Sequence, residues 1–183
     1  MFILIIAMIG LSSAQFMPNC QLPFHHGIQE CSNSSVIRFH FDITTEKCLA
    51  FKYSGCGGNA NNFETYSDCR MSCIPMDYFT CPGASKPIPN KDGKSNCGGF
   101  EKTECDGPNT YCLNGPFSGI CCDKTIQEKV NADYEKECGP NQKKHLFDIG
   151  GVHIPLFGKS CDSNFCPEST KCQQGNYFAY CCV

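Results

Sequence analysis

The sequence contains no tryptophan, carries few charged residues and has no excess of basic ones. Charged residues make up 18% of the 183 positions, and 15 lysines and arginines stand against 18 aspartates and glutamates, a formal net charge of −3. Proteins that bind nucleic acid, heparin-like polymers or anionic membrane faces present a basic patch or stripe. This sequence has none, so we expect no nucleic-acid partner.

Catalytic sequence motifs are absent as well. The chain has no Gly-x-Ser-x-Gly, no His-Glu-x-x-His and no glycine-rich phosphate loop. Its 18 cysteines are even in number, so full pairing leaves no thiolate to act as a nucleophile or, with the five histidines, as a zinc ligand. We therefore expect neither an enzyme nor a protein with a metal or another cofactor.

Cysteine is the residue that the chain has in abundance, 18 in 183 residues. That level is typical of secreted disulfide scaffolds, whereas the cytosol would keep the thiols reduced. The N-terminus agrees, because an apolar run from Phe2 to Leu11 is followed by the small residues Ser12-Ser13-Ala14. A helix of about ten residues spans roughly half of a bilayer's hydrocarbon core. We predict a signal peptide at 1–14 and a secreted, extracellular protein without a membrane anchor.

The cysteines fall into three sets of six, each of which predicts one small module. The sets are Cys20, Cys31, Cys48, Cys56, Cys69 and Cys73; Cys81, Cys97, Cys105, Cys112, Cys121 and Cys122; and Cys138, Cys161, Cys166, Cys172, Cys181 and Cys182. In the second and third sets the fourth cysteine precedes an adjacent pair by nine residues. This agreement indicates an internal repeat, with cysteine-rich modules at 77–123 and 138–183.

Between the two repeats, residues 124–137 are charged and contain no cysteine. We interpret this segment as a solvated linker. Ile126, Val130 and Tyr134 recur every four residues, so the alternative is a helix with one apolar face.

Around the first cysteine set the sequence predicts a small α+β unit. Residues 36–41 and 50–53 are rich in aromatic and β-branched side chains, which favours a twisted β-hairpin with a turn at 42–47. Thr65, followed three positions later by Asp68, is related to the capping box that starts a helix. On that short helix two cysteines four positions apart would share one face.

One stretch also resembles a known family. Phe51-Lys-Tyr-Ser-Gly55-Cys56, with Phe63, Cys69 and Cys73 at set distances, is similar to the signature of the Kunitz (pancreatic trypsin inhibitor-type) domain. We place that domain at 17–76. The resemblance implies three disulfides and two buried asparagines: Cys20–Cys73, Cys31–Cys56, Cys48–Cys69, Asn61 and Asn62. The two repeats resemble lustrin-type cysteine-rich repeats, which accompany Kunitz domains in some nematode secreted proteins.

The resemblance implies serine protease inhibition by a rigid loop that enters the enzyme as a substrate would. The contact residues would be Cys31, Ser32, Asn33, Ser34, Ser35, Ser54 and Gly55. Ser32 takes the primary position, where trypsin-directed members carry Lys or Arg. It is too short for the charged floor of a trypsin-like pocket, so an elastase-like partner fits better than a trypsin-like one.

Two features of the loop favour another interpretation. Asn33-Ser34-Ser35 is a glycosylation acceptor, and a glycan on Asn33 would collide with an incoming protease. Ser54 stands where the family usually has glycine. The alternative is a non-inhibitory extracellular binding or matrix module on a Kunitz scaffold. A toxin-like channel blocker would need a basic surface, which the sequence lacks.

Overall fold

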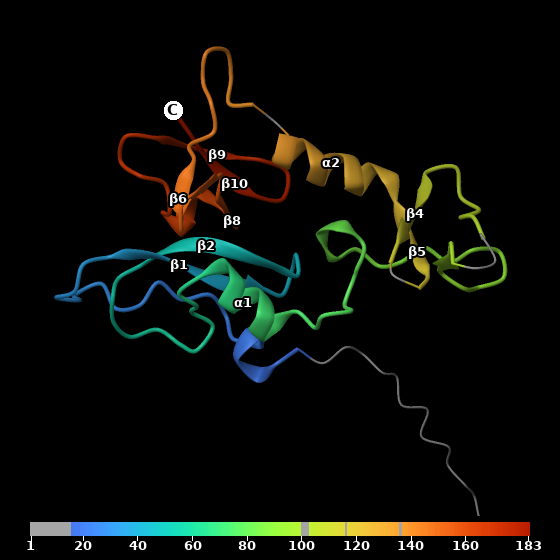
Figure 1. The fold of residues 1–183 in the computed structure, drawn as a ribbon, viewed down its shortest axis with the longest axis horizontal. Helices are drawn as coiled ribbons and strands as arrows, with labels where there is room; N and C mark the ends of the chain where they lie inside the picture. Colours follow the sequence, from blue (N-terminus) through green and yellow to red (C-terminus); the bar gives the residue numbers. More distant parts are fainter. Residues whose placement is uncertain (1–15, 100–102, 116, 136) are drawn as a thin grey trace, which may run out of the picture.

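The computed structural model describes residues 16–99, 103–115, 117–135 and 137–183, so the expected signal peptide at 1–14 lies outside the described residues. Figure 1 shows three parts: a hairpin with helix α1, a small sheet containing β4 and β5, and a second small sheet containing β9 and β10. Within the described ranges, no helix has the length and apolar character that crossing a membrane requires.

The first part has the predicted hairpin and helix. Strands β1 (Val36–Asp42) and β2 (Lys47–Tyr53) pair antiparallel. Helix α1 (Tyr66–Cys73) begins after Thr65, whose Oγ1 accepts the backbone N–H of Asp68 at 3.0 Å. A short 3-10 helix, η1 (Pro18–Gln21), precedes them. The expectation of a disulfide-rich α+β unit is confirmed.

Every cysteine of the chain is in a disulfide, nine in all. In the first part the structure joins the pairs that the family resemblance implies, Cys20–Cys73, Cys31–Cys56 and Cys48–Cys69. A domain of this size buries little apolar surface, so such cross-links carry much of its stability.

The two cysteine-rich repeats have the same disulfide connectivity. In each, the first cysteine pairs with the sixth, the second with the fourth and the third with the fifth: Cys81–Cys122, Cys97–Cys112 and Cys105–Cys121, then Cys138–Cys182, Cys161–Cys172 and Cys166–Cys181. Each repeat also forms a three-stranded sheet with the last strand in the centre.

The strands of these sheets are short. Counting the Kunitz-like part as the first module, we call residues 77–123 the second repeat and residues 138–183 the third repeat. The second repeat contributes β3 (Asn96–Cys97), β4 (Thr110–Asn114) and β5 (Gly119–Asp123), after the 3-10 turn η2 (Pro82–Ala84). The third contributes β8 (Phe157–Gly158), β9 (Lys171–Gln174) and β10 (Ala179–Cys182), with η3 (Cys161–Ser163) between. A separate hairpin, β6 (Phe147–Ile149) with β7 (Val152–Ile154), comes before β8.

The segment between the repeats corrects one sequence-based interpretation. Residues 124–135 form helix α2 (Lys124–Glu135) rather than a solvated chain. Val130 is 5% exposed and packs with Leu49 and Phe178, and the Tyr134 ring lies 4.9 Å from that of Phe157. The structure has the alternative, a helix with one apolar face, because charge on one helix face is compatible with burial of the other.

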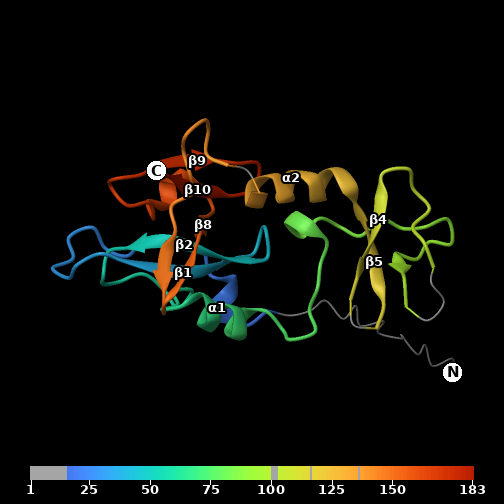
Figure 2. The same cartoon turned by 45° about the horizontal axis from the view of Figure 1, so that its top comes forward.

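The third repeat packs directly on the Kunitz-like hairpin, which the sequence did not predict. Both views place β8 and β10 against β1 and β2 (Figures 1 and 2). One continuous cluster of buried side chains joins them, including Phe39, Phe41, Leu156, Phe165 and Ala179. The first and third parts therefore share a hydrophobic core, although the second repeat separates them in sequence.

Polar contacts reinforce this packing. Lys159 Nζ lies 2.8 Å from Oδ2 of Asp42, the last residue of β1, and that carboxylate is largely buried. Burial opposes its charged form, but the hydrogen bonds from Lys159 and Thr45 hold the pKa of Asp42 below its usual value. The buried Asp133 of α2 accepts the backbone N–H groups of Tyr177 and Phe178 in the β9–β10 turn, at 2.6 and 3.1 Å.

Candidate functional site

The loop that the resemblance assigns to protease contact directly precedes β1. Ser32, Asn33, Ser34 and Ser35 are all exposed. In both views this segment lies at the end of the molecule away from β4 and β5 (Figures 1 and 2). The second repeat therefore leaves the loop free to meet a partner.

A disulfide and a hydrogen bond join this loop to the segment 54–58. Cys31 is bonded to Cys56. Two residues along, Asn33 Nδ2 donates to the carbonyl oxygen of Gly55 at 3.0 Å. The predicted contact residues thus come together at one place, from two stretches of chain about twenty residues apart in the sequence.

The segment 54–58 is itself fixed by backbone hydrogen bonds to the loop between Cys20 and Cys31, the first loop of the domain. Ser54 N donates to His26 O at 2.8 Å, and Ile28 N donates to Cys56 O at 3.0 Å. The Ser54 hydroxyl donates to the same Cys56 carbonyl at 3.2 Å. A Cβ on Gly27, whose φ is +93°, would lie 2.2 Å from that hydroxyl. Ser54 therefore uses its side chain inside the scaffold, with glycine opposite it.

A buried histidine lies beneath these loops, and sequence reasoning did not identify it. His40 is 2% exposed, its ring 4.7 Å from the Phe24 ring and 5.6 Å from that of Phe51. Among the described residues neither ring nitrogen has a hydrogen-bond partner. Burial lowers the pKa of His40 to about 4, against the opposing charge of Asp42. The available signal was its place in a strand of alternating aromatic residues.

Asn61 holds the base of the site. Its side chain is 2% exposed, its Oδ1 accepts the N–H of Phe41 at 2.8 Å, and its Nδ2 donates to the carbonyls of Leu22 and Phe41, each at 2.9 Å. A buried amide with these partners fixes the first loop to the hairpin. Asn62 is half-buried.

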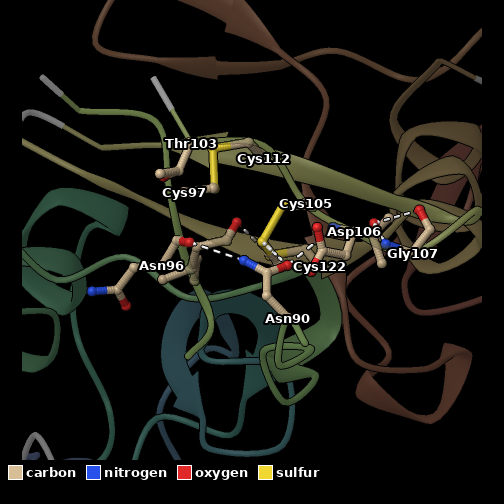
Figure 3. Close-up of a disulfide and its surroundings, with 12 residues drawn as sticks. Asn90, Asn96, Cys97, Thr103, Cys105, Asp106, Gly107, Cys112 and Cys122 are labelled. Carbon is tan, nitrogen blue, oxygen red and sulfur yellow. Dashed lines mark hydrogen bonds between the residues drawn. A yellow bond between two sulfur atoms is a disulfide. The ribbon is translucent and has the colours of Figure 1, made fainter. Parts of the chain in front are cut away.

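One cluster of cysteine sulfurs lies close enough together to suggest a metal site. The sulfurs of Cys97, Cys105 and Cys112 lie within 4.8 Å of one another in the second repeat. Figure 3 shows the Cys97–Cys112 bridge beside Cys105. All three sulfurs are in disulfides, Cys97 with Cys112 and Cys105 with Cys121. Zinc binds the thiolate, so these sulfurs are not available as ligands.

One family model and several known proteins are similar to this chain. The family model of the Kunitz/Bovine pancreatic trypsin inhibitor domain matches residues 19–74. Over 168 residues the chain is 36% identical to the "Major allergen Ani s 1" of Anisakis simplex, a match that covers 89% of this chain and 86% of that protein. It is 34% identical over 163 residues to "BPTI/Kunitz inhibitor domain-containing protein C02F12.5" of Caenorhabditis elegans, covering 89% and 88%.

Two further matches cover about a third of the chain. "Kunitz-type serine protease inhibitor 2" of Hemachatus haemachatus is 40% identical over 55 residues, 30% of this chain and 91% of that protein. The solved structure of calcicludine shows 41% identity and a TM-score of 0.28 over 31% of this chain and 88% of its own. Since two nematode relatives match along most of both sequences, and one of them is named for this domain, the chain belongs to the Kunitz/BPTI domain-containing family.

Proposed function

We propose that this chain is a secreted inhibitor of serine proteases and that the loop from Cys31 to Ser35 enters the enzyme's active site as a substrate would. The observation that carries the proposal is the loop's geometry: Ser32 is exposed, and its two neighbours are tied to residues 55 and 56 by a disulfide and a hydrogen bond. A loop held in one shape loses little conformational entropy on docking, which favours binding.

The side chain of Ser32 sets the expected specificity. It carries no positive charge and buries little area, so it leaves the acidic floor of a trypsin-like pocket unpaired. Loss of such an anchor residue can cost about 4 kcal/mol or more in binding. We infer an elastase-like target with a small specificity pocket, and no catalytic activity in the chain itself.

Support for secretion comes from the disulfides. All 18 cysteines are paired, and such complete pairing persists in oxidising compartments. Processing at the predicted signal peptide can be tested by N-terminal sequencing of the protein exported by a eukaryotic host. A mature chain starting at Gln15 is expected. A protein retained in the cell with Met1 in place would contradict the proposal.

Titration of the full chain against trypsin, chymotrypsin and elastase tests the inhibition. Ser35→Ala serves as the starting protein, because it removes the glycosylation signal and keeps Asn33. We expect elastase to be inhibited with a constant below about 10 μM, a binding free energy stronger than roughly −7 kcal/mol. Ser32→Lys should move inhibition from elastase to trypsin. Constants weaker than this for all three enzymes, in both proteins, would refute inhibition through this loop.

One observation favours a second candidate function. Asn33 is exposed on the loop and starts the acceptor sequence Asn33-Ser34-Ser35. A glycan there would block the approach of a protease, and the domain would then be a rigid support for extracellular or matrix binding. Mass spectrometry of the exported wild-type chain measures the occupancy of Asn33, and its inhibition is compared with that of the glycan-free Ser35→Ala protein. Full occupancy, with inhibition by Ser35→Ala and none by the wild type, would favour the second candidate for the natural protein.

A further inference from the structure

The hydrogen bond between Asn33 and Gly55 has a specific place in the proposed contact loop. Asn33 follows Ser32, so its nitrogen belongs to the peptide bond that a protease would attack. Its side-chain Nδ2 donates to the Gly55 carbonyl at 3.0 Å, across 22 positions of sequence. The side chain therefore fixes Asn33, whose nitrogen would be released when that bond is cut, to the segment 54–58.

Glycine at position 55 makes this contact close. Its φ is +100°, and a Cβ there would lie 2.7 Å from the Asn33 Cβ and 3.1 Å from the Ser34 carbonyl oxygen. Any larger residue would push the two loops apart. The positive φ is also a conformation that glycine adopts without strain. The glycine and the amide thus act together, one giving space and the other a bond.

The acceptor side of the bond is rigid. Gly55 lies between Ser54, whose N–H is bonded to His26, and Cys56, whose carbonyl accepts from Ile28. The Tyr53 hydroxyl also donates to the Gly57 carbonyl at 2.8 Å. A bond to a carbonyl held on both sides restrains its donor more than a bond to a free loop would.

We propose that Asn33 is the residue that positions the leaving side of the reactive bond, and that its amide determines how well the loop resists cleavage. This rests on the proposed function. Attack by the protease breaks the bond between the Ser32 carbonyl carbon and the Asn33 nitrogen. The acyl group passes to the enzyme's nucleophilic oxygen, and the proton of that hydroxyl passes to the Asn33 nitrogen. We call the hydrogen bond from Asn33 Nδ2 to the Gly55 carbonyl the latch. Because the latch keeps this amine beside the acyl group, the reverse step restores the intact bond faster than water removes the acyl group.

The same atom links the latch to the acceptor sequence. A glycan would be attached to Asn33 Nδ2 and would leave it one hydrogen, so modification and the latch use one nitrogen. Ser35→Ala separates the two effects, since it abolishes modification and leaves the amide intact. Asn33→Asp in that background keeps the shape of the side chain and replaces the donor with an acceptor.

Asn59 offers a matched control. Its Nδ2 also donates to a backbone carbonyl, that of Pro23, at 2.7 Å, but it lies outside the segment 31–35. Asn59→Asp therefore removes a bond of the same kind away from the reactive peptide. All variants are made in the full-length chain with Ser35→Ala.

With elastase we expect Asn33→Asp to raise the inhibition constant and the rate of cleavage between Ser32 and Asn33 at least tenfold. Asn59→Asp should change each less than about twofold, while both variants lower the melting temperature similarly. Equal cleavage rates and constants for Asn33→Asp and its parent would overturn the latch. If the Ser35→Ala parent inhibits no protease, the proposed function fails instead. The latch is then decided by NMR: slow exchange of the Asn33 side-chain amide protons supports it, and free exchange refutes it.

Discussion

The second and third repeats have the same cross-links and differ in what lies between them. Their disulfide connectivity and strand order are identical. In the third, aromatic side chains are buried around the bridges: Phe165, Phe178 and Tyr180 are at most 1% exposed. In the second, the large apolar side chain at the β4–β5 turn, Phe117, is 82% exposed.

Polar contacts take the place of an apolar core in the second repeat. Asn90 donates from Nδ2 to the Asn96 carbonyl at 3.3 Å, and its Oδ1 accepts the N–H of Asp106 at 3.0 Å. Figure 3 shows this asparagine beneath the two disulfides. In return, the Asp106 carboxylate accepts the N–H of Lys91 at 2.9 Å.

The difference shows what a disulfide pattern determines. It fixes which strands lie side by side, and it leaves open whether the module buries a surface against a neighbour. The aromatic residues of the third repeat pack on the Kunitz domain, so these two modules share one hydrophobic core although they are far apart in the sequence. The second repeat is attached mainly through its two ends and is stabilised chiefly from within.

Truncation of a core aromatic residue should have the largest effect. Phe178→Ala removes a side chain that is 0% exposed and packs with Leu49 of the Kunitz hairpin. We expect a loss of about 3–5 kcal/mol in the free energy of unfolding. Phe117→Ala in the second repeat should change it by less than about 0.5 kcal/mol. Urea unfolding of both full-length variants measures this, and equal losses would mean that the repeats have equivalent cores.

Deletion of one equivalent disulfide from each repeat comes next. The Cys105–Cys121 and Cys166–Cys181 bridges have sequence separations of 16 and 15, so the loop-entropy model gives each about 3 kcal/mol. We expect double Cys→Ala replacement to unfold the second repeat and to leave the third folded on its aromatic core. Hydrogen exchange followed by mass spectrometry resolves the two. If the amides of the second repeat stay protected from exchange, or if only those of the third repeat lose protection, the proposed difference between the two repeats is wrong.

The third effect comes from pH in the Kunitz domain and should be at most about 3 kcal/mol. Burial lowers the pKa of His40 from 6.5 to about 4, so the unfolded chain binds the proton more tightly than the folded one. Stability should therefore fall as the pH drops from about 6.5 to about 4 and then level off for this group. Asp42, Lys159 and His26 also act on His40, with Asp42 opposing the shift.

Unfolding of the wild type and of His40→Phe between pH 7 and pH 4 measures this dependence. The phenylalanine variant should lose most of the slope in that window. Asp42 does not obscure it, because its lowered pKa places the loss of its own stabilisation below about pH 4. An unchanged slope in His40→Phe would show that other groups are responsible.

The sequence predicted the Kunitz part well because local signals and long-range constraints agree there. Aromatic and β-branched runs gave the hairpin, and Thr65 gave the start of α1. Docking of the third repeat could not be predicted, since apolar residues such as Leu156 and Phe165 indicate burial without indicating against which surface. The single sequence likewise carries no signal for the Asn33–Gly55 bond, which depends on how two loops meet.

The most direct test of the account is the position of the first cut made by the target protease. The full-length Ser35→Ala protein is incubated with a catalytic amount of elastase, and the products are mapped by mass spectrometry without reduction and then after it. We predict slow cleavage between Ser32 and Asn33 alone, with the two halves still joined by disulfides and the inhibitor still active. Rapid cutting elsewhere, with residues 31–35 untouched, would contradict the proposal that this loop is the inhibitory site.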